Sequence, residues 1–276
     1  MTASRTRKKP DAALARHLAQ ALPVATRAAI EAGEFIHSRF GRFRKLTSKP
    51  DTSLVTEVDK GSEKIVVGRL RKAFPNDNIL GEEGGLSQGQ RVSDFRWHVD
   101  PLDGTTNFVH GFPFFCVSIG LEYERDDLVL GVIYQPITKD LYLARRGKGA
   151  TRNGKRMQVS KTARLRDGLL STGFSMRHDK FFSDEIASFA AITLASHAVR
   201  RTGSAALDLV HVATGQFDAF WERGLSSWDV AAGLTLVAEA GGDYSRMDGK
   251  AFQIGDDSVL ASNGRLHKEL LSIAAR

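Results

Sequence analysis

The sequence has few of the residues that would cross-link the chain or hold it in a membrane. Cys116 is the single cysteine among 276 residues, so an internal disulfide bond is impossible and a thiolate-rich zinc site is excluded. No apolar run approaches the roughly 20 residues that a membrane-spanning helix needs. Arg16 and His17 interrupt the apolar stretch near the N-terminus, which argues against a secretory signal. We expect a cytoplasmic protein in a reducing compartment, while the Arg-rich residues 1–16 leave an organellar transit peptide open.

The bulk composition is that of a globular protein with excess positive charge. Hydrophobic residues make up 42% and charged residues 26% of the chain, and the net charge is +7. Part of the excess lies in a short basic head containing Arg5, Arg7, Lys8 and Lys9. We interpret this head as a flexible terminus rather than a nucleic-acid-binding arm. Because no linker divides the chain, we expect an extension over residues 1–20 and one domain over 21–276, with a metal-binding half at about 21–165 and a second α/β half at about 166–276.

Apolar periodicity predicts the regular elements. The expected helices are Val24–Phe40, Asp59–Phe74, Asp184–Ser196, Ser204–Thr214, Ser227–Ala240 and Leu266–Ala275. The expected strands are Asn78–Leu80, Phe95–Val99, Val117–Tyr123, Leu128–Tyr134, Leu141–Ala144, Lys155–Val159, Gly168–Phe174, Ala198–Arg201, Asp218–Trp221 and Val259–Ser262. The first half of the chain has helices followed by an antiparallel sheet, and in the second half strands and helices alternate. This order indicates a layered α/β fold, and it does not determine the order of the strands.

The most informative motif is the run Asp100-Pro101-Leu102-Asp103-Gly104-Thr105-Thr106-Asn107-Phe108, which follows a predicted strand. Its two carboxylates flank a proline that fixes the backbone and lacks an N–H group. Carboxylates and a main-chain carbonyl suit hard cations, and free N–H groups at the start of a helix can bind an anion. Two carboxylates this close repel each other unless a cation lies between them. The run therefore predicts a site for a metal ion and a phosphate group.

Other acidic residues also lie at the ends of predicted elements. Glu82 and Glu83 follow a strand, and Asp229 and Asp59 each open a helix. Taken singly, Asp229 and Asp59 are typical helix N-caps, and Glu82-Glu83 is typical of a solvated loop. If they cluster with the acids of the long run, they would surround one cavity with oxygen ligands suited to Mg²⁺ or Mn²⁺.

Five ordered motifs resemble those of the inositol monophosphatase family, among the lithium-sensitive, Mg²⁺-dependent phosphatases. They are Leu54-Val55-Thr56-Glu57-Val58-Asp59, Gly81-Glu82-Glu83, the run from Asp100 to Phe108, Gly203-Ser204-Ala205-Ala206 and Trp228-Asp229-Val230-Ala231-Ala232-Gly233. The resemblance extends from about Val24 to the C-terminus, and the segment from Arg200 to Leu209 looks like the bacterial extragenic-suppressor branch. It implies an α/β fold with α+β character, a layered αβαβα sandwich of the inositol monophosphatase / fructose-1,6-bisphosphatase type. It also implies a homodimer.

The resemblance further implies roles for the matching residues. The metal ligands would be Glu82, Asp100, Leu102 through its carbonyl, Asp103 and Asp229. They would hold two or three Mg²⁺ ions. Mn²⁺ can substitute for Mg²⁺, and Li⁺ would inhibit the enzyme. The substrate-binding residues would be Asp103, Gly104, Thr105, Gly203, Ser204, Ala205 and Glu222. The catalytic residues would be Glu82, which orients a metal-activated water, and Thr105 with Asp59, which help to take its proton.

The leading hypothesis is an inositol-1-monophosphatase that hydrolyses a phosphate monoester to myo-inositol and phosphate. The same chemistry on fructose-1,6-bisphosphate, histidinol phosphate or a 3′-phosphoadenosine nucleotide stays open, because the phosphate-handling motifs do not distinguish these substrates. An alternative of another class is a transcription-antitermination protein with an RNA polymerase or RNA-associated partner and a retained phosphatase site. The basic head fits a polyanionic partner, but the sequence shows no RNA-binding motif.

Overall fold

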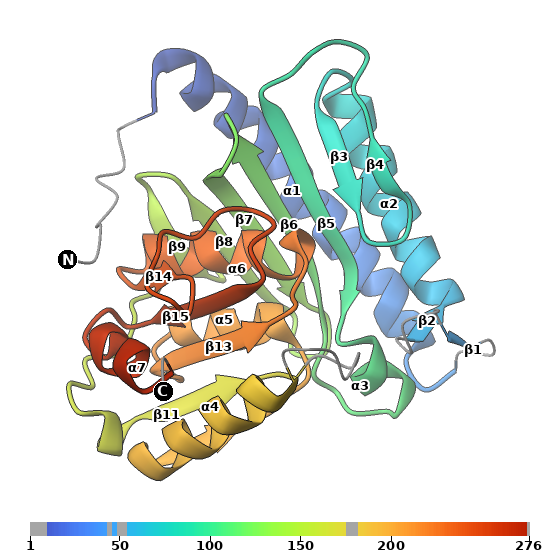
Figure 1. The fold of residues 1–276 in the computed structure, drawn as a ribbon. Coiled ribbons are helices and arrows are strands. Elements are labelled where there is room, and N and C mark those ends of the chain that lie inside the picture. Colours follow the sequence, from blue (N-terminus) through green and yellow to red (C-terminus); the bar gives the residue numbers. More distant parts are fainter. Residues whose placement is uncertain (1–9, 43–45, 49–53, 175–181, 275–276) are drawn as a thin grey trace.

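The computed structural model describes residues 10–42, 46–48, 54–174 and 182–274, which form alternating layers of helix and sheet (Figure 1). The helices are α1 (Ala12–Arg39), α2 (Glu57–Ala73), α3 (Thr105–Val109), α4 (Phe182–Ala195), α5 (Ala205–Ala213), α6 (Ser227–Glu239) and α7 (His267–Ala274). Helices α1 and α2 cover one face of an eight-stranded sheet, and α6 packs on its other face. Beyond α5 and α6 lies a five-stranded sheet, with α7 and α4 outside it. This is the αβαβα sandwich that the resemblance implies.

The large sheet is a mostly antiparallel meander with one parallel pair. In spatial order its strands are β10 (Lys155–Arg156), β9 (Gly149–Arg152), β8 (Asp140–Arg145), β7 (Asp127–Gln135), β6 (Cys116–Tyr123), β5 (Phe95–Asp103), β3 (Asn78–Gly81) and β4 (Gly85–Ser87). The parallel pair is β3 and β5. Its two strands therefore end at the same edge of the sheet, so the acidic residues that follow them are brought together.

The smaller sheets complete the strand inventory. The five-stranded sheet has the order β12 (Ala198–Arg200), β11 (Leu169–Thr172), β13 (Ala219–Arg223), β15 (Ser258–Ser262) and β14 (Asp243–Ser245), and a two-stranded sheet pairs β1 (Leu46–Ser48) with β2 (Leu54–Thr56). A short 3₁₀ helix spans Leu165–Asp167. Strands β12, β11 and β13 are parallel, whereas β15 runs antiparallel to both of its neighbours.

Helix α1 begins at Ala12, well before the helix predicted from Val24, so residues 12–20 do not belong to a flexible extension. Asp11 caps the helix by accepting hydrogen bonds from the N–H groups of Ala13 and Leu14. Leu14 and Leu18 are buried against the core of the large sheet. The burial of these two side chains is the physical reason that the helix extends this far.

The hairpin around Asn153-Gly154 also differs from the prediction. Its two strands are β9 and the two-residue β10. The strand that the sequence predicts over residues 155–159 ends at Arg156, and the sequence does not predict β9. Asn153 has a positive φ of 49° and Gly154 one of 78°, as a tight primed turn requires. The turn signal is therefore confirmed.

Helix α6 occupies the central layer and approaches the large sheet closely. A Cβ atom on Gly120 of β6 would lie 2.6 Å from the Cβ atom of Ala231, and one on Gly131 of β7 would overlap the carbonyl of Ala232. Two strand glycines therefore set the depth at which α6 lies on the sheet. No described helix is long and apolar enough to cross a membrane.

Candidate active site

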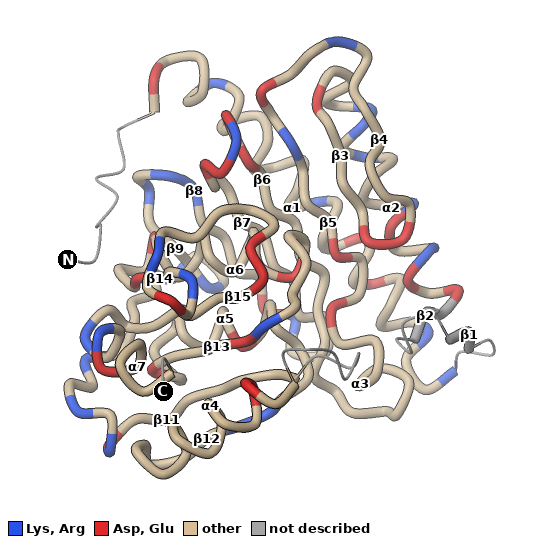
Figure 2. The backbone as a smooth tube through the Cα atoms, in the orientation of Figure 1, with Lys and Arg blue, Asp and Glu red and all other residues tan. Residues whose placement is uncertain are grey.

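The parallel pairing of β3 and β5 places Glu82 beside Asp100. Gly81 is paired with Val99, and the N–H group of Glu82 donates to the carbonyl oxygen of Val99 over 3.1 Å. Figure 2 shows acidic residues gathered where β3, β5 and the first turn of α2 meet. The sheet register therefore makes neighbours of two acids from separate motifs.

A bulge in β5 separates its two acidic residues. Asp100 pairs with Ser118 and Asp103 with Cys116, so three steps along β5 match two along β6. Such a bulge bends the strand and re-aims its side chains. Pro101, which has no N–H group to contribute to the ladder, lies within it.

Asp103 connects the large sheet to helix α5. Its Oδ2 atom accepts hydrogen bonds from the Ser204 hydroxyl and from the Ala206 N–H group, the latter at 2.8 Å. Ser204 is the N-cap of α5, and Gly203 before it has a positive φ of 84°. The loop predicted to contact substrate is thus held directly by a predicted metal ligand.

Asp229 lies in the first turn of α6 and is anchored by its own helix. Its Oδ2 atom accepts from the Ser226 N–H group at 2.7 Å in a capping box. The start of α6 is fixed to the sheet because the Ser227 hydroxyl lies 2.8 Å from His98 Nδ1. The N-cap of α6 is therefore Ser226 and not Asp229, which occupies the N3 position of the capping box. This capping contact does not exclude a second role for Asp229.

Thr105 joins the first turns of α2 and α3. Its hydroxyl lies 2.9 Å from Asp59 Oδ1 and 3.0 Å from the Leu102 carbonyl oxygen. Ser62, one turn further along α2, donates to the Pro101 carbonyl oxygen at 2.7 Å. Gly104 is the N-cap of α3 with a φ of 93°, a conformation that side chains other than that of glycine rarely adopt.

The acids perturb one another strongly. Burial, followed by the charges of Glu82, Asp103 and Asp229, raises the pKa of Asp100 well above its ordinary value. Burial, followed by the charges of Asp103 and Glu82, raises the pKa of Asp229 to about 8. Burial also raises the pKa of Asp103, against the hydrogen bonds from Ser204 and Ala206. The Cys116 sulfur lies 3.8 Å from Asp103 Oδ2, but burial raises its pKa and keeps it a neutral thiol. Buried carboxylates that repel one another form a donor set that fits a hard divalent cation.

The side-chain positions are nevertheless not those of an assembled metal centre. Among the described residues, no group of three or more His, Cys, Asp or Glu side chains converges on one point that could hold an ion. The acceptor atoms of Asp103 and Asp229 are directed at protein N–H and O–H donors. The acids are therefore close enough to interact electrostatically, and their assignment as ligands stays a prediction.

A cavity of about 260 Å³ lies beside these acids. Among its lining residues are Asp103, Gly203, Ser204, Ala205, Glu222 and Asp229. The other predicted site residues, Asp59, Glu82, Asp100, Leu102, Gly104 and Thr105, do not line it. Burial, followed by the charges of Asp208 and Asp229, raises the pKa of Glu222 well above its ordinary value.

Three residues that have no role in the sequence-based prediction hold parts of the site. His98 anchors the start of α6, as described above. Asn107 donates from Nδ2 to the carbonyl oxygens of Phe114 and Thr202 at 2.8 and 2.9 Å. Asp208, which is 1% exposed, accepts from the Thr202 hydroxyl at 2.8 Å. Asn107 and Asp208 had a signal in the sequence, because they belong to the long motif and to the segment from Arg200 to Leu209, whereas His98 had none.

Comparison with known proteins agrees with this geometry. A profile of the Inositol monophosphatase family matches residues 17–276. The chain is 42% identical over 250 residues to "Inositol-1-monophosphatase" of Synechocystis, an alignment that covers 90% of this chain and 86% of that protein. It is 41% identical over 256 residues to "Nus factor SuhB" of Pseudomonas aeruginosa, an alignment that covers 91% of this chain and 94% of that protein. The solved inositol monophosphatase of Anabaena superposes with a TM-score of 0.84 at 40% identity, covering 94% of this chain and 96% of that one. The solved extragenic suppressor protein suhB of Bartonella henselae superposes with a TM-score of 0.87 at 37% identity. The superposition covers 92% of this chain and 98% of that one.

The fold, the acidic cavity and these relatives define a phosphatase. The chain belongs to the inositol monophosphatase family.

Proposed function

We propose that this phosphatase is a Mg²⁺-dependent inositol-1-monophosphatase. The observation that carries the proposal is the convergence of Asp103, Asp229 and Glu222 with the Gly203–Ala205 loop on one cavity, beside the adjacent pair Glu82 and Asp100. Two relatives at 42% and 41% identity bear the name inositol-1-monophosphatase.

Glu82, Asp100, Asp103, Asp229 and the Leu102 carbonyl would hold the Mg²⁺ ions. When bound, such ions supply a Lewis acid that lowers the pKa of a water molecule and neutralises charge on the leaving oxygen. Mn²⁺ would be accepted by the same oxygens, and Li⁺ would inhibit.

The chain's own residues would move the proton and place the substrate. Glu82 orients the attacking water, and the Thr105 hydroxyl accepts its proton while passing its own to Asp59, 2.9 Å away. The N–H groups of the N-cap Gly104 and of Thr105, the first residue of α3, have no acceptor within the helix and would bind the phosphoryl oxygens. Asp103, Glu222 and the loop from Gly203 to Ala205 would contact the ring hydroxyls.

Phosphate release from inositol-1-phosphate and fructose-1,6-bisphosphate, measured side by side with and without Mg²⁺, tests the proposal. Mg²⁺-dependent release from the inositol ester alone supports it. Comparable release from both esters would make the protein a dual-specificity sugar phosphatase. Release from neither would contradict the assignment and direct the search to histidinol phosphate and 3′-phosphoadenosine nucleotides.

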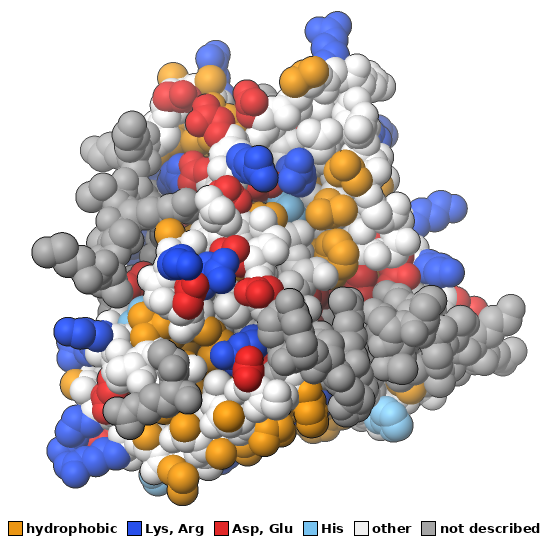
Figure 3. All heavy atoms as spheres, viewed as in Figure 1, with side chains coloured by type: hydrophobic (Ala, Val, Ile, Leu, Met, Phe, Trp, Pro, Cys, Tyr) orange, Lys and Arg blue, Asp and Glu red, His pale blue; other side chains and the backbone are white. Residues whose placement is uncertain are grey.

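We also propose that the protein is a homodimer. Helix α4 exposes Ile186 and Leu194, the latter to 90%, and Figure 3 shows hydrophobic side chains in a row along the lower edge of the molecule, over α4. Apolar surface of this kind favours burial against a partner. Sedimentation of the wild type and of Leu194→Glu would test it, with dissociation expected for the variant.

A second candidate function is association with the transcription machinery, which the name Nus factor of three relatives supports. Asp100→Asn in cells that lack the protein would separate the two functions. Rescue of a transcription phenotype by this inactive variant would favour the second function, and failure to rescue would favour catalysis as the cellular role.

A further inference from the structure

One segment of the chain has a net positive charge larger than the net charge of the whole protein. Residues 145–166 contain nine Lys or Arg residues and no Asp or Glu, whereas the net charge of the chain is +7, so the remainder is slightly acidic. Figure 2 shows much of this segment as blue stretches on the side of the molecule where β8 and β9 lie. The charge is thus localised on one part of the fold.

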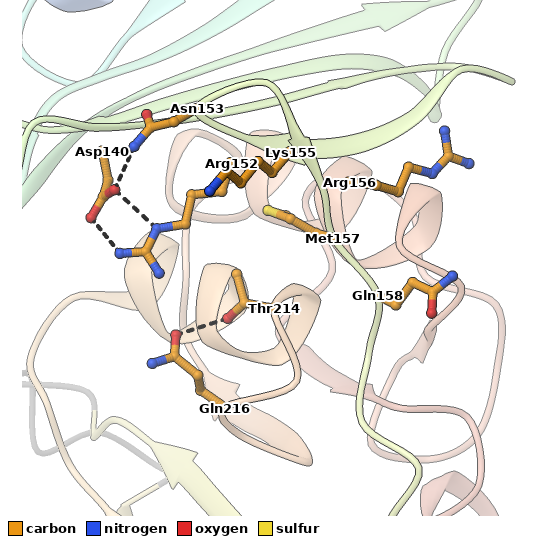
Figure 4. Close-up of a pocket in the computed structure, with 9 residues that line it drawn as sticks. All are labelled: Asp140, Arg152, Asn153, Lys155, Arg156, Met157, Gln158, Thr214 and Gln216. Carbon is orange, nitrogen blue, oxygen red and sulfur yellow. Dashed lines mark hydrogen bonds and ion pairs between the residues drawn. The ribbon is translucent and has the colours of Figure 1, made fainter.

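This segment borders a groove of about 640 Å³ (Figure 4). One wall is the β9–β10 hairpin with Arg152, Asn153, Lys155 and Arg156. The other wall, distant in sequence, follows the end of α5 and contributes Thr214 and Gln216. None of its lining residues is shared with the cavity of the phosphatase site.

The arginine of the first wall is fixed by a buried carboxylate. Asp140, which is 5% exposed, accepts from Arg152 Nε at 2.9 Å and Nη2 at 2.7 Å, and from Asn153 Nδ2 at 2.8 Å. This bidentate pair holds the guanidinium plane and leaves Nη1 without a partner among the described residues. Lys155 likewise forms no ion pair within the part of the chain that the structure describes.

The second wall presents a further donor. Gln216 Oε1 accepts from the Thr214 hydroxyl at 3.0 Å and lies 2.8 Å from His211 Nδ1. Its oxygen is thus occupied, and its Nε2 atom has no acceptor among the described residues. Because Asp140 is already engaged by Arg152 and Asn153, donors of Arg152, Lys155 and Gln216 predominate in the groove.

We propose that this groove is a second binding site, separate from the phosphatase centre, for a small, multiply phosphorylated compound. Its volume is that of a small-molecule site, and fixed cationic and amide donors on two walls match phosphate oxygens. No aromatic side chain lines it, so it offers no stacking surface for the bases of a single-stranded nucleic acid. Helix α5 begins at the catalytic cavity and ends beside the groove, about 13 Å away along its axis.

Calorimetric titration of the full chain with inorganic triphosphate in EDTA tests the proposal, since EDTA removes metal-dependent binding at the catalytic acids. We expect saturable binding of one triphosphate per chain, weakened about tenfold or more by Lys155→Gln and by Gln216→Ala, each of which removes one donor. Lys268→Gln, on exposed α7, removes the same charge as Lys155→Gln and should leave the affinity unchanged. Circular dichroism confirms that each variant is folded.

Three results would overturn the proposal. The first is an absence of binding by the wild type at millimolar triphosphate. The second is equal weakening by Lys155→Gln and Lys268→Gln, which would mean attraction by net charge alone. The third is tighter binding of a single-stranded oligonucleotide than of triphosphate, with sensitivity to Lys155→Gln, which would make the groove a nucleic-acid surface.

Discussion

The side chain of Asn107 donates a 2.9 Å hydrogen bond to the main-chain carbonyl oxygen of Thr202, which lies 95 residues further along the chain. The same Nδ2 atom donates to the carbonyl oxygen of Phe114, so one amide joins α3 to the segment that leads into the Gly203 loop. This amide therefore holds α3 and the loop around Gly203 in one arrangement.

Asn107→Ala removes these two hydrogen bonds and a longer one, of 3.4 Å, to the Gly203 carbonyl oxygen, so three partly buried carbonyl groups each lose a partner. Because Asn107 positions the loop, we expect KM to rise more than kcat falls, with kcat/KM lower by about tenfold or more. Steady-state kinetics with inositol-1-phosphate would measure the split. Asn78→Ala is the matched control, since that amide also binds loop main chain but at the far end of β3. A fall in kcat with unchanged KM would contradict a positioning role.

Asp229→Asn should have opposite effects on stability and on metal dependence. The pKa of Asp229 is raised to about 8 from 3.8, so without metal this carboxyl group destabilises the fold progressively as the pH rises through that window. Asn still accepts the Ser226 hydrogen bond but carries no charge. We expect a higher free energy of unfolding than wild type in EDTA at about pH 8, together with a higher Mg²⁺ concentration for half-maximal activity. Lower stability in EDTA would be inconsistent with this electrostatic account.

Glu122 should make folding stability sensitive to acid. Burial by itself raises the pKa of Glu122, but hydrogen bonds from His98 and the Asp126 N–H group, with the charge of Arg96, hold that pKa below 4.5. A depressed carboxyl pKa contributes stability above pH 4.5 that is lost as the pH falls through the lower folded value. We expect the stability difference between wild type and Glu122→Gln to shrink between about pH 6 and pH 3, as denaturant unfolding would measure. A constant difference would exclude ionisation of Glu122 as its source.

Two glycines of α2 should respond oppositely to alanine. Gly68 is exposed, and a Cβ atom there meets nothing within 4 Å, so Gly68→Ala should stabilise the protein by about 0.5–1 kcal/mol. At Gly61 a Cβ atom would overlap the ring of Phe35 on α1, so Gly61→Ala should destabilise by about 1–3 kcal/mol. Urea unfolding of both variants gives the comparison. Stabilisation by both would mean that α1 and α2 pack more loosely than described.

The elements that the sequence predicts well are those with strong local patterns. The hairpin of β6 and β7 and the helices α5 and α6 carry continuous apolar periodicity, and their ends lie near the predicted residues. Strand β9, with the sequence Gly149-Ala150-Thr151-Arg152, has too little alternation to be recognised. The early start of α1 was hidden by Arg16 and His17. His17 stacks on Phe95 at 3.6 Å, and this partner cannot be inferred from local sequence.

In the candidate site, too, the residues with a strong local sequence pattern were predicted and the contacts between distant segments were not. The acids were predicted because their motifs are contiguous, and the carboxyl ends of β3 and β5 bring two of them together. The contacts that hold the site, such as His98 with Ser227 or Asp103 with Ala206, join residues more than a hundred positions apart. Such pairings depend on the strand order and on how α5 and α6 pack on the sheet, which periodicity does not specify.

The central position of α6 has a consequence for biosynthesis. Asp229 and one wall of the acidic cavity reach the large sheet only through α6, a helix that is synthesised after every strand of that sheet. The first sheet can be completed co-translationally, yet its acids face one another without the helix that covers them. Catalytic activity in a translation time course should therefore appear as a late step, after the chain has passed Glu239 and not in proportion to its length.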